Sequence, residues 1–195
     1  AGRCQCSGGN TIGIGCDALK GSSTVNTNTA NFNVAIGKGA GMAATSAQYN
    51  VLVGLCAGRQ LTTGEQNIFL GMYTACNLET GSNNIALGRA AGIDMNSLAG
   101  YNIFIGYCAG NTSTSGLRNI AIGCDVELPS ATECCQLAIG QGTSRWITGD
   151  SSFNVTLAGI ATATASGGIF EATKFCGDGS CLTGIAGWAP TTGAK

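Results

Sequence analysis

The sequence contains no histidine and only 2 prolines among its 195 residues, and charged residues make up 10% of the chain. Without histidine, and with scattered carboxylates, no nucleophile can be paired with a general base, so we predict that the chain is not an enzyme. The formal net charge of −1 offers no electrostatic footprint for nucleic acid. No apolar run approaches the ~20 residues of a membrane-spanning helix. We therefore expect neither a nucleic-acid partner nor membrane insertion.

Glycine and cysteine are abundant instead, with 32 and 11 residues respectively. Glycine without a three-residue period or frequent proline argues against collagen, and the hydrophobic content of 44% argues against disorder. Without histidine or paired C-x-x-C motifs, the cysteines favour disulfides over a metal site, and we expect no cofactor. The odd count leaves at least one cysteine free or bonded to another chain. The candidate disulfide residues are Cys4, Cys6, Cys134, Cys135, Cys176 and Cys181.

A five-residue pattern recurs along most of the chain: Asn, apolar, any residue, apolar, Gly. It reads NVAIG from Asn33, NIFLG from Asn67 and NIAIG from Asn119, with weaker copies from Thr11 and Gln136. The closing glycines of successive copies are 22, 17, 17, 17, 18, 17 and 17 residues apart. This nearly fixed period predicts a solenoid. Dense glycine with Ile and Val at the apolar positions favours parallel β-coils stacked about 4.8 Å apart.

The Asn that opens each copy should fall at the same place in every coil. Stacked amides there can hydrogen-bond along the solenoid, as in cross-β stacks. The alternative is that Asn only tolerates the geometry of a turn. The Gly that closes each copy is expected to supply a positive φ at a corner. The ladder candidates are Asn33, Asn50, Asn67, Asn84, Asn102 and Asn119.

Alternation within each strand decides which side chains face the interior of the coil. We assign the flanking residues, such as Ile68 and Leu70, to the interior and the residues between them to the outer surface. Strands that are apolar on both faces are normally buried on both. We therefore expect Leu52, Phe69 and Phe104 to pack between identical chains around an axis, in a trimer. The middle positions are Gly13, Ala35, Leu52, Phe69, Ala86, Phe104, Ala121 and Ala138.

The fold class expected is all-β, a β-solenoid or parallel β-roll of eight coils of roughly 17 residues. We divide the chain into a cysteine-containing N-terminal arm (residues 1–9), the solenoid (10–144) and a β-rich C-terminal tail or connector (145–195). Alternating residues from Ile169 to Phe175 favour a strand in the tail. A β-prism made by intertwined chains is one form that the tail can take.

Two resemblances follow from these residues. The NVAIG and NIAIG copies are similar to the head repeats of trimeric autotransporter adhesins, which form parallel β-rolls packed side by side; the period of 17 is longer than is usual there. The segments from Arg145 to Asn154 and from Phe175 to Ile185 resemble segments of tail-fibre and other structural proteins of cyanophages and related tailed phages. Cys176 and Cys181 depart from that pattern. The resemblance implies an elongated, trimeric appendage outside a cell or on a virion surface.

Two hypotheses for function remain. The first is a structural subunit of an extracellular fibre or filament, which assembles with copies of itself through apolar coil faces and disulfides, as a homotrimer or a head-to-tail filament. The second is a receptor-binding or adhesin tip that recognises a cell-surface glycan. Nearly constant loop lengths and an aromatic content of only 6% favour the first.

Overall fold

The computed structural model describes residues 10–21, 29–96 and 99–158. The expected N-terminal arm, the expected strand from Ile169 to Phe175, and the candidate disulfide residues Cys4, Cys6, Cys176 and Cys181 lie outside these ranges. Within the described residues the regular structure consists of ten strands and no helix. The strands are β1 (Ile12–Ile14), β2 (Val34–Ile36), β3 (Val51–Val53), β4 (Ile68–Leu70), β5 (Ile85–Leu87), β6 (Ile103–Ile105), β7 (Ile120–Ile122), β8 (Leu137–Gln141), β9 (Ser144–Gly149) and β10 (Val155–Leu157).

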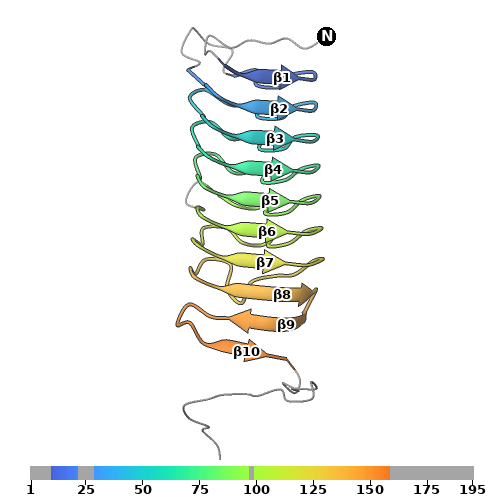
Figure 1. Cartoon of the computed structure of the whole chain (residues 1–195), viewed down its shortest axis with the longest axis vertical. Coiled ribbons are helices and arrows are strands. Elements are labelled where there is room, and N and C mark those ends of the chain that lie inside the picture. The colour runs from blue at the N-terminus through green and yellow to red at the C-terminus, as the bar shows by residue number, and fades with distance from the viewer. Residues whose placement is uncertain (1–9, 22–28, 97–98, 159–195) are drawn as a thin grey trace, which may run out of the picture. The chain divides into compact units, whose positions relative to one another are not determined.

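All ten strands form one sheet in sequence order (Figure 1). Strands β1 to β8 pair in parallel with their neighbours, and each strand is matched residue for residue with the strand of the next coil. The chain between successive strands closes one coil, so the predicted β-solenoid is confirmed.

The sheet does not end where the repeat ends. Strand β9 turns back antiparallel to β8, and β10 runs antiparallel to β9. The edge of β8 still presents unpaired backbone groups, and a hairpin satisfies them without another copy of the repeat. The solenoid sheet therefore extends past residue 144, the end that the sequence suggested, as far as Leu157.

The corners of the coils depend on glycine. The closing glycines of the first seven copies have φ between 125° and 143°, which L side chains rarely adopt. At Gly71 a Cβ atom would lie 2.5 Å from the carbonyl oxygen of Gly88 in the next coil. The predicted positive φ is confirmed at these seven positions. Gly140 lacks it, because β8 continues through this residue to pair with β9.

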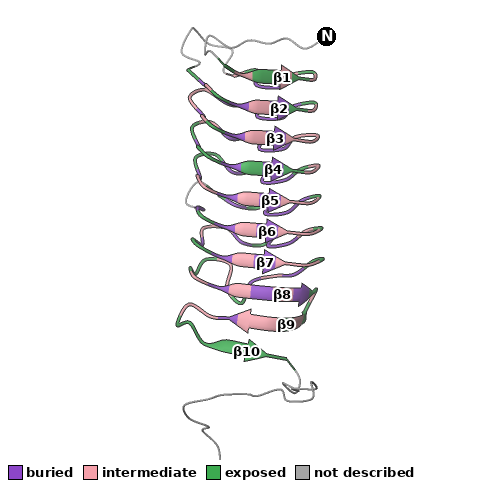
Figure 2. Cartoon of the chain, in the orientation of Figure 1, coloured by how far each residue is buried: buried purple, intermediate pink, exposed green. Residues whose placement is uncertain are grey.

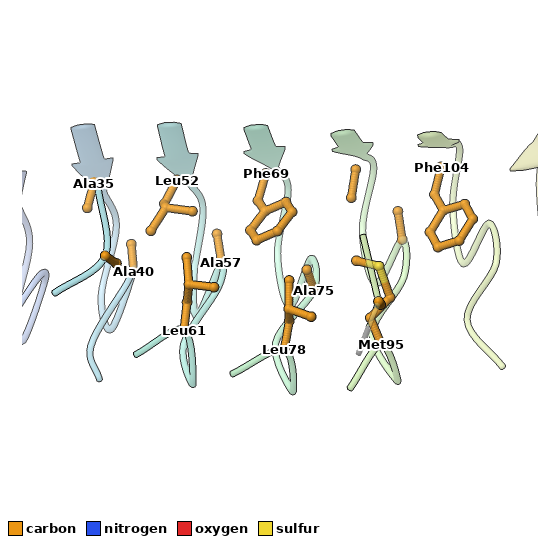
Figure 3. Packing of buried hydrophobic residues seen from close by; sticks show 14 of the residues in the cluster. Ala35, Ala40, Leu52, Ala57, Leu61, Phe69, Ala75, Leu78, Met95 and Phe104 are labelled. Carbon is orange, nitrogen blue, oxygen red and sulfur yellow. The ribbon is translucent and has the colours of Figure 1, made fainter. Parts of the chain in front are cut away.

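The interior of the solenoid is filled by the middle residue of each strand. Leu52 is 1% exposed, and Phe69 and Phe104 are 0% exposed, within a single chain. Figure 3 shows these side chains pointing inward, toward residues from the later part of each coil such as Leu61 and Leu78. The expectation that Leu52, Phe69 and Phe104 face neighbouring chains is therefore wrong: they form the core of one chain.

The Asn that opens each copy explains why the middle residue of the strand faces inward. Asn50 and Leu52 are two residues apart and so lie on the same face of the strand. Asn50 is fully buried, because its amide needs partners that the neighbouring coils supply. An inward ladder places the middle residue inside and sends the flanking residues outward. Alternation in the sequence did not determine which set of positions faces the interior, because both sets are apolar.

The Asn ladder is present and runs through six coils. The backbone N–H and the Nδ2 of Asn67 both donate to Oδ1 of Asn50, at 2.9 and 3.0 Å. Equivalent backbone bonds link Asn33, Asn50, Asn67, Asn84, Asn102 and Asn119 in order. The Nδ2 of Asn67 also donates to the carbonyl oxygen of Gly81, so the ladder ties each strand to the turn of the next coil.

The ladder ends at Gln136. Its backbone N–H donates to Oδ1 of Asn119 at 2.8 Å, but its longer side chain folds back onto its own coil. There Nε2 donates to the carbonyl oxygens of Ser130 and Glu133, and Oε1 accepts from the N–H of Ser130. The amide of Gln136 is thus satisfied locally and terminates the stack.

Candidate functional site

The outward surface of the sheet is an almost uninterrupted array of aliphatic side chains, which we call the aliphatic face. It consists of the two flanking positions of each strand, which stack in two columns along the sheet. The first column is Ile12, Val34, Val51, Ile68, Ile85, Ile103, Ile120, Leu137, Gly149 and Val155, and the second is Ile14, Ile36, Val53, Leu70, Leu87, Ile105, Ile122, Ile139, Ile147 and Leu157.

These side chains remain accessible to solvent in the single chain. Ile36 is 38% and Ile68 is 39% exposed, and Figure 2 shows the strands of the sheet mostly as intermediate or exposed. Apart from Gly149, every position is Ile, Val or Leu, and none is charged or polar. When one face of a sheet is exposed to solvent, the strand positions on that face are normally occupied by polar residues. Apolar patches of this extent are typical of interaction surfaces.

Aromatic residues border the aliphatic face on both sides. Phe32, Tyr49 and Tyr101 each precede a ladder residue and are exposed, with left-handed φ between 55° and 59°. The rings of Phe32 and Tyr49 stack, with centroids 5.0 Å apart and an angle of 2° between the planes. Tyr107 lies on the opposite side, after the closing glycine of its coil. Exposed aromatic residues at the edge of an apolar patch are frequent at protein–protein interfaces.

The two arginines near these aromatics are already engaged within the chain. The guanidinium of Arg89 lies 5.3 Å from the ring centre of Tyr107 and donates from Nη1 to the Tyr107 hydroxyl at 3.0 Å. The guanidinium of Arg118 lies 5.7 Å from the ring centre of Tyr101. These contacts direct each charge along the border of the aliphatic face, so the face itself stays neutral.

The cysteines of the described coils are free thiols. Cys134 is exposed and Cys135 half-buried, and neither forms the disulfide that the sequence suggested. Within the described ranges no group of three or more His, Cys, Asp or Glu side chains is arranged to hold a metal ion.

A hydrogen-bonded turn joins β9 to β10. Oδ1 of Asp150 accepts from the backbone N–H of Ser152 and of Asn154, at 2.9 and 3.0 Å, and Oδ2 accepts from Nδ2 of Asn154 at 2.9 Å. These bonds favour the ionised form, so the side chain and backbone of Asn154 hold the pKa of Asp150 below its usual value.

The Asp150 turn should therefore open in acid. A carboxylate with a lowered pKa stabilises the folded turn above its unfolded pKa of ~3.9, and this contribution disappears as the pH falls through the lower folded value. We expect hydrogen exchange at the N–H groups of Ser152 and Asn154, corrected for its intrinsic pH dependence, to lose protection below about pH 4. Asp150→Asn should remove this pH dependence. Constant protection in the wild-type chain down to pH 2 would contradict the assignment.

No helix among the described residues is long and apolar enough to cross a membrane. Comparisons with protein-family models, with curated proteins and with solved structures find no match to this chain.

Proposed function

We propose that the chain is a structural, non-enzymatic subunit of an extracellular fibre or filament, and that it assembles with copies of itself through the aliphatic face. The observation that supports this most strongly is the composition of that face, which apart from Gly149 offers a partner only branched aliphatic side chains over ten strands. A face without charge fits a partner face without charge, and a second copy of the chain supplies one.

The dimensions of the aliphatic face set the area that self-association can bury. Ten strands at a spacing of about 4.8 Å extend over ~45 Å, and two side-chain columns are ~10 Å wide. Two such faces in contact would bury on the order of 900 Å², just below the ~1,000 Å² expected of a specific interface. The bordering Phe32, Tyr49 and Tyr101 add to this area. Three copies around an axis, as the resemblance to the adhesin heads implies, would cover the face of every copy.

The regular stacking of the coils also suits a structural role. Each solenoid coil adds one strand to the same sheet, so identical chains packed side by side match coil for coil without a change of register. Trimeric assembly and position on a fibre or virion surface belong to this proposal, together with joining of successive subunits through the terminal cysteines.

A glycan-binding tip is the second candidate, because exposed aromatic rings are common sugar platforms. The stacking of Phe32 on Tyr49 weighs against it. A sugar ring packs on an open aromatic face, and here each of these two rings covers one face of the other. The remaining exposed rings do not form a larger platform among the described residues.

The assembly proposal predicts that charges on the aliphatic face prevent association without unfolding the chain. Ile36→Lys combined with Ile68→Lys places one ammonium in each column, at positions already exposed in the single chain. We expect the double variant to sediment as a monomer, and wild type as a homo-oligomer. The thermal unfolding of the variant, compared at equal subunit concentration, should remain a single cooperative transition.

The matched control introduces the same charges elsewhere. Thr63 and Thr132 are exposed residues that occupy equivalent positions in their coils, away from the aliphatic face. Thr63→Lys combined with Thr132→Lys should leave the sedimentation of the oligomer unchanged. If wild type remains monomeric at high concentration and negative-stain images show isolated particles, the proposal is wrong. Specific retention of that monomer on a glycan array would favour the tip.

A further inference from the structure

Two cysteines occupy the same corner of the solenoid in neighbouring coils. Cys108 follows β6 by three residues, and Cys124 follows β7 by two. The ladder of β6 and β7 pairs Ile105 with Ile122 and continues beyond the strands, because Gly123 N–H donates to the Ile105 carbonyl and Asp125 N–H donates to the Tyr107 carbonyl, both at 2.8 Å. Cys124 therefore lies beside Tyr107, and Cys108 beside Asp125.

This register places the two thiols on a short diagonal. Cys108 and Cys124 differ by one coil and by one residue along the coil. With a strand spacing of about 4.8 Å and a Cα step of about 3.8 Å, their Cα atoms are on the order of 6 Å apart. This lies within the range of ~4.4–6.8 Å that a disulfide requires. The estimated Cα separation therefore permits a bond between the two side chains.

The surroundings leave both thiols able to react. Cys124 is exposed and Cys108 is half-buried, and both are free. The thiol of Cys124 donates only a weak bond to Oδ2 of Asp125, at 3.5 Å. Partial desolvation, followed by the Asp125 carboxylate and the neighbouring Cys108, raises the pKa of Cys124. The thiol is therefore largely protonated at neutral pH and would react faster above it.

Cys56 provides a comparison within the same chain. It occupies the position in its coil that Cys108 occupies, also with a left-handed φ, but Met72 takes the diagonal place in the following coil. Its sulfur lies 3.4 Å from the point where a Cβ of Gly39 would be. Among the described residues, only Cys108 has a cysteine on this diagonal.

We propose that Cys108 and Cys124 form an intrachain disulfide that joins two successive coils of the solenoid. The oxidant is a low-molecular-weight disulfide, as found in oxidising compartments. The thiolate of Cys124 attacks the oxidant, breaks its S–S bond and releases one thiol. The thiolate of Cys108 then attacks the mixed disulfide at Cys124, forms the protein S–S bond and releases the second thiol. Two electrons pass from the cysteines to the oxidant, and the two cysteine protons go to solvent or to the released thiols.

The bond would act as a staple between coils. Each coil of a solenoid contacts only its neighbours, so local opening can spread along the stack. A disulfide that closes residues 108–124 into a ring restricts the unfolded chain and opposes separation of the sixth and seventh coils. This inference concerns one chain alone and does not depend on assembly.

The test is oxidation of the full chain with oxidised glutathione at pH 8.5, alkylation of the remaining thiols, and peptide mass spectrometry. We expect a cross-linked peptide pair containing Cys108 and Cys124, and no cross-link between either of these residues and Cys56. The oxidised chain should unfold about 5–10 °C above Cys108→Ser treated in the same way. Cys56→Ser should not reduce this shift.

Both variants should fold, because other coils carry Gly, Ala or Tyr at the position that Cys56 and Cys108 share. Recovery of both cysteines unlinked after oxidation would overturn the proposal. So would linkage of Cys124 to any other cysteine, whether in the same chain or in another copy. Because the cross-link is read on monomeric chains after denaturation, loss of assembly leaves the result unaffected.

Discussion

Gly71→Val is expected to unfold the solenoid around its fourth coil and to lower the free energy of unfolding by about 3–5 kcal/mol. Gly71 has a φ of 143°, and a Cβ there would lie 2.5 Å from the Gly88 carbonyl oxygen and 2.6 Å from its carbon. The neighbour is backbone of the next coil, which cannot move without breaking the ladder between β4 and β5. Denaturant unfolding followed by circular dichroism would measure the loss.

Gly142→Val is the matched control for this substitution. Gly142 also has a positive φ, of 54°, but a Cβ there would meet no atom within 4 Å. The control therefore carries only the cost of a left-handed backbone, roughly 1–2 kcal/mol. The difference between the two variants measures the steric clash between coils together with the larger backbone strain at the φ of 143°. Equal and small losses at both positions would show that the stacked corner at Gly71 is misassigned.

Asn67→Leu is expected to be similarly damaging, because it removes a central rung of the Asn ladder. The substitution keeps the number of side-chain heavy atoms but removes the partner of the Gly81 carbonyl and of the Asn84 N–H, and one of the two donors to Oδ1 of Asn50. The backbone N–H of Asn67 is retained and can still donate to Asn50. Buried groups without partners cost about 1–3 kcal/mol each, so we expect a loss of ~3–5 kcal/mol in the free energy of unfolding.

The adjacent residue supplies the control. Gln66 also carries an amide but is exposed, and the corresponding residue in other coils is Phe, Tyr or Arg. Gln66→Leu should therefore change the free energy of unfolding by less than about 0.5 kcal/mol. If Asn67→Leu is as well tolerated as Gln66→Leu, the amide stack contributes little, and the Asn residues serve only local turn geometry.

The architecture could be predicted from the sequence because it rests on spacing. The period of 17 residues, the closing glycines and the Asn at a constant place required coils of equal length, and backbone hydrogen bonding between equal coils required a parallel sheet. The positive φ at the corners followed from the same residues. The hairpin of β9 and β10 was not predicted as part of this sheet, because its segment lacks the repeat and joins only through backbone pairing.

The direction in which each side chain points was decided by tertiary structure. Ile68 and Phe69 are both apolar, and alternation says only that they face opposite ways. The narrow interior selects Phe69, since Phe69 shares its strand face with the buried amide of Asn67, and residues such as Leu78 fill the opposite wall. Two features of the sequence point the same way. The inner column varies from Gly to Phe, as side chains matched to an opposite wall do, whereas the outer columns carry only Ile, Val and Leu apart from Gly149.

The sequence by itself determined a repetitive all-β chain built from coils of nearly equal length. It also determined where the coils begin and turn, because each of those features depends on residues close together in the chain. Only the tertiary structure decided that the two aliphatic columns face outward, and that Cys108 lies diagonal to Cys124. Both depend on which residues of different coils become neighbours, and that is set by the stacking register of the coils together with the burial of the Asn amides.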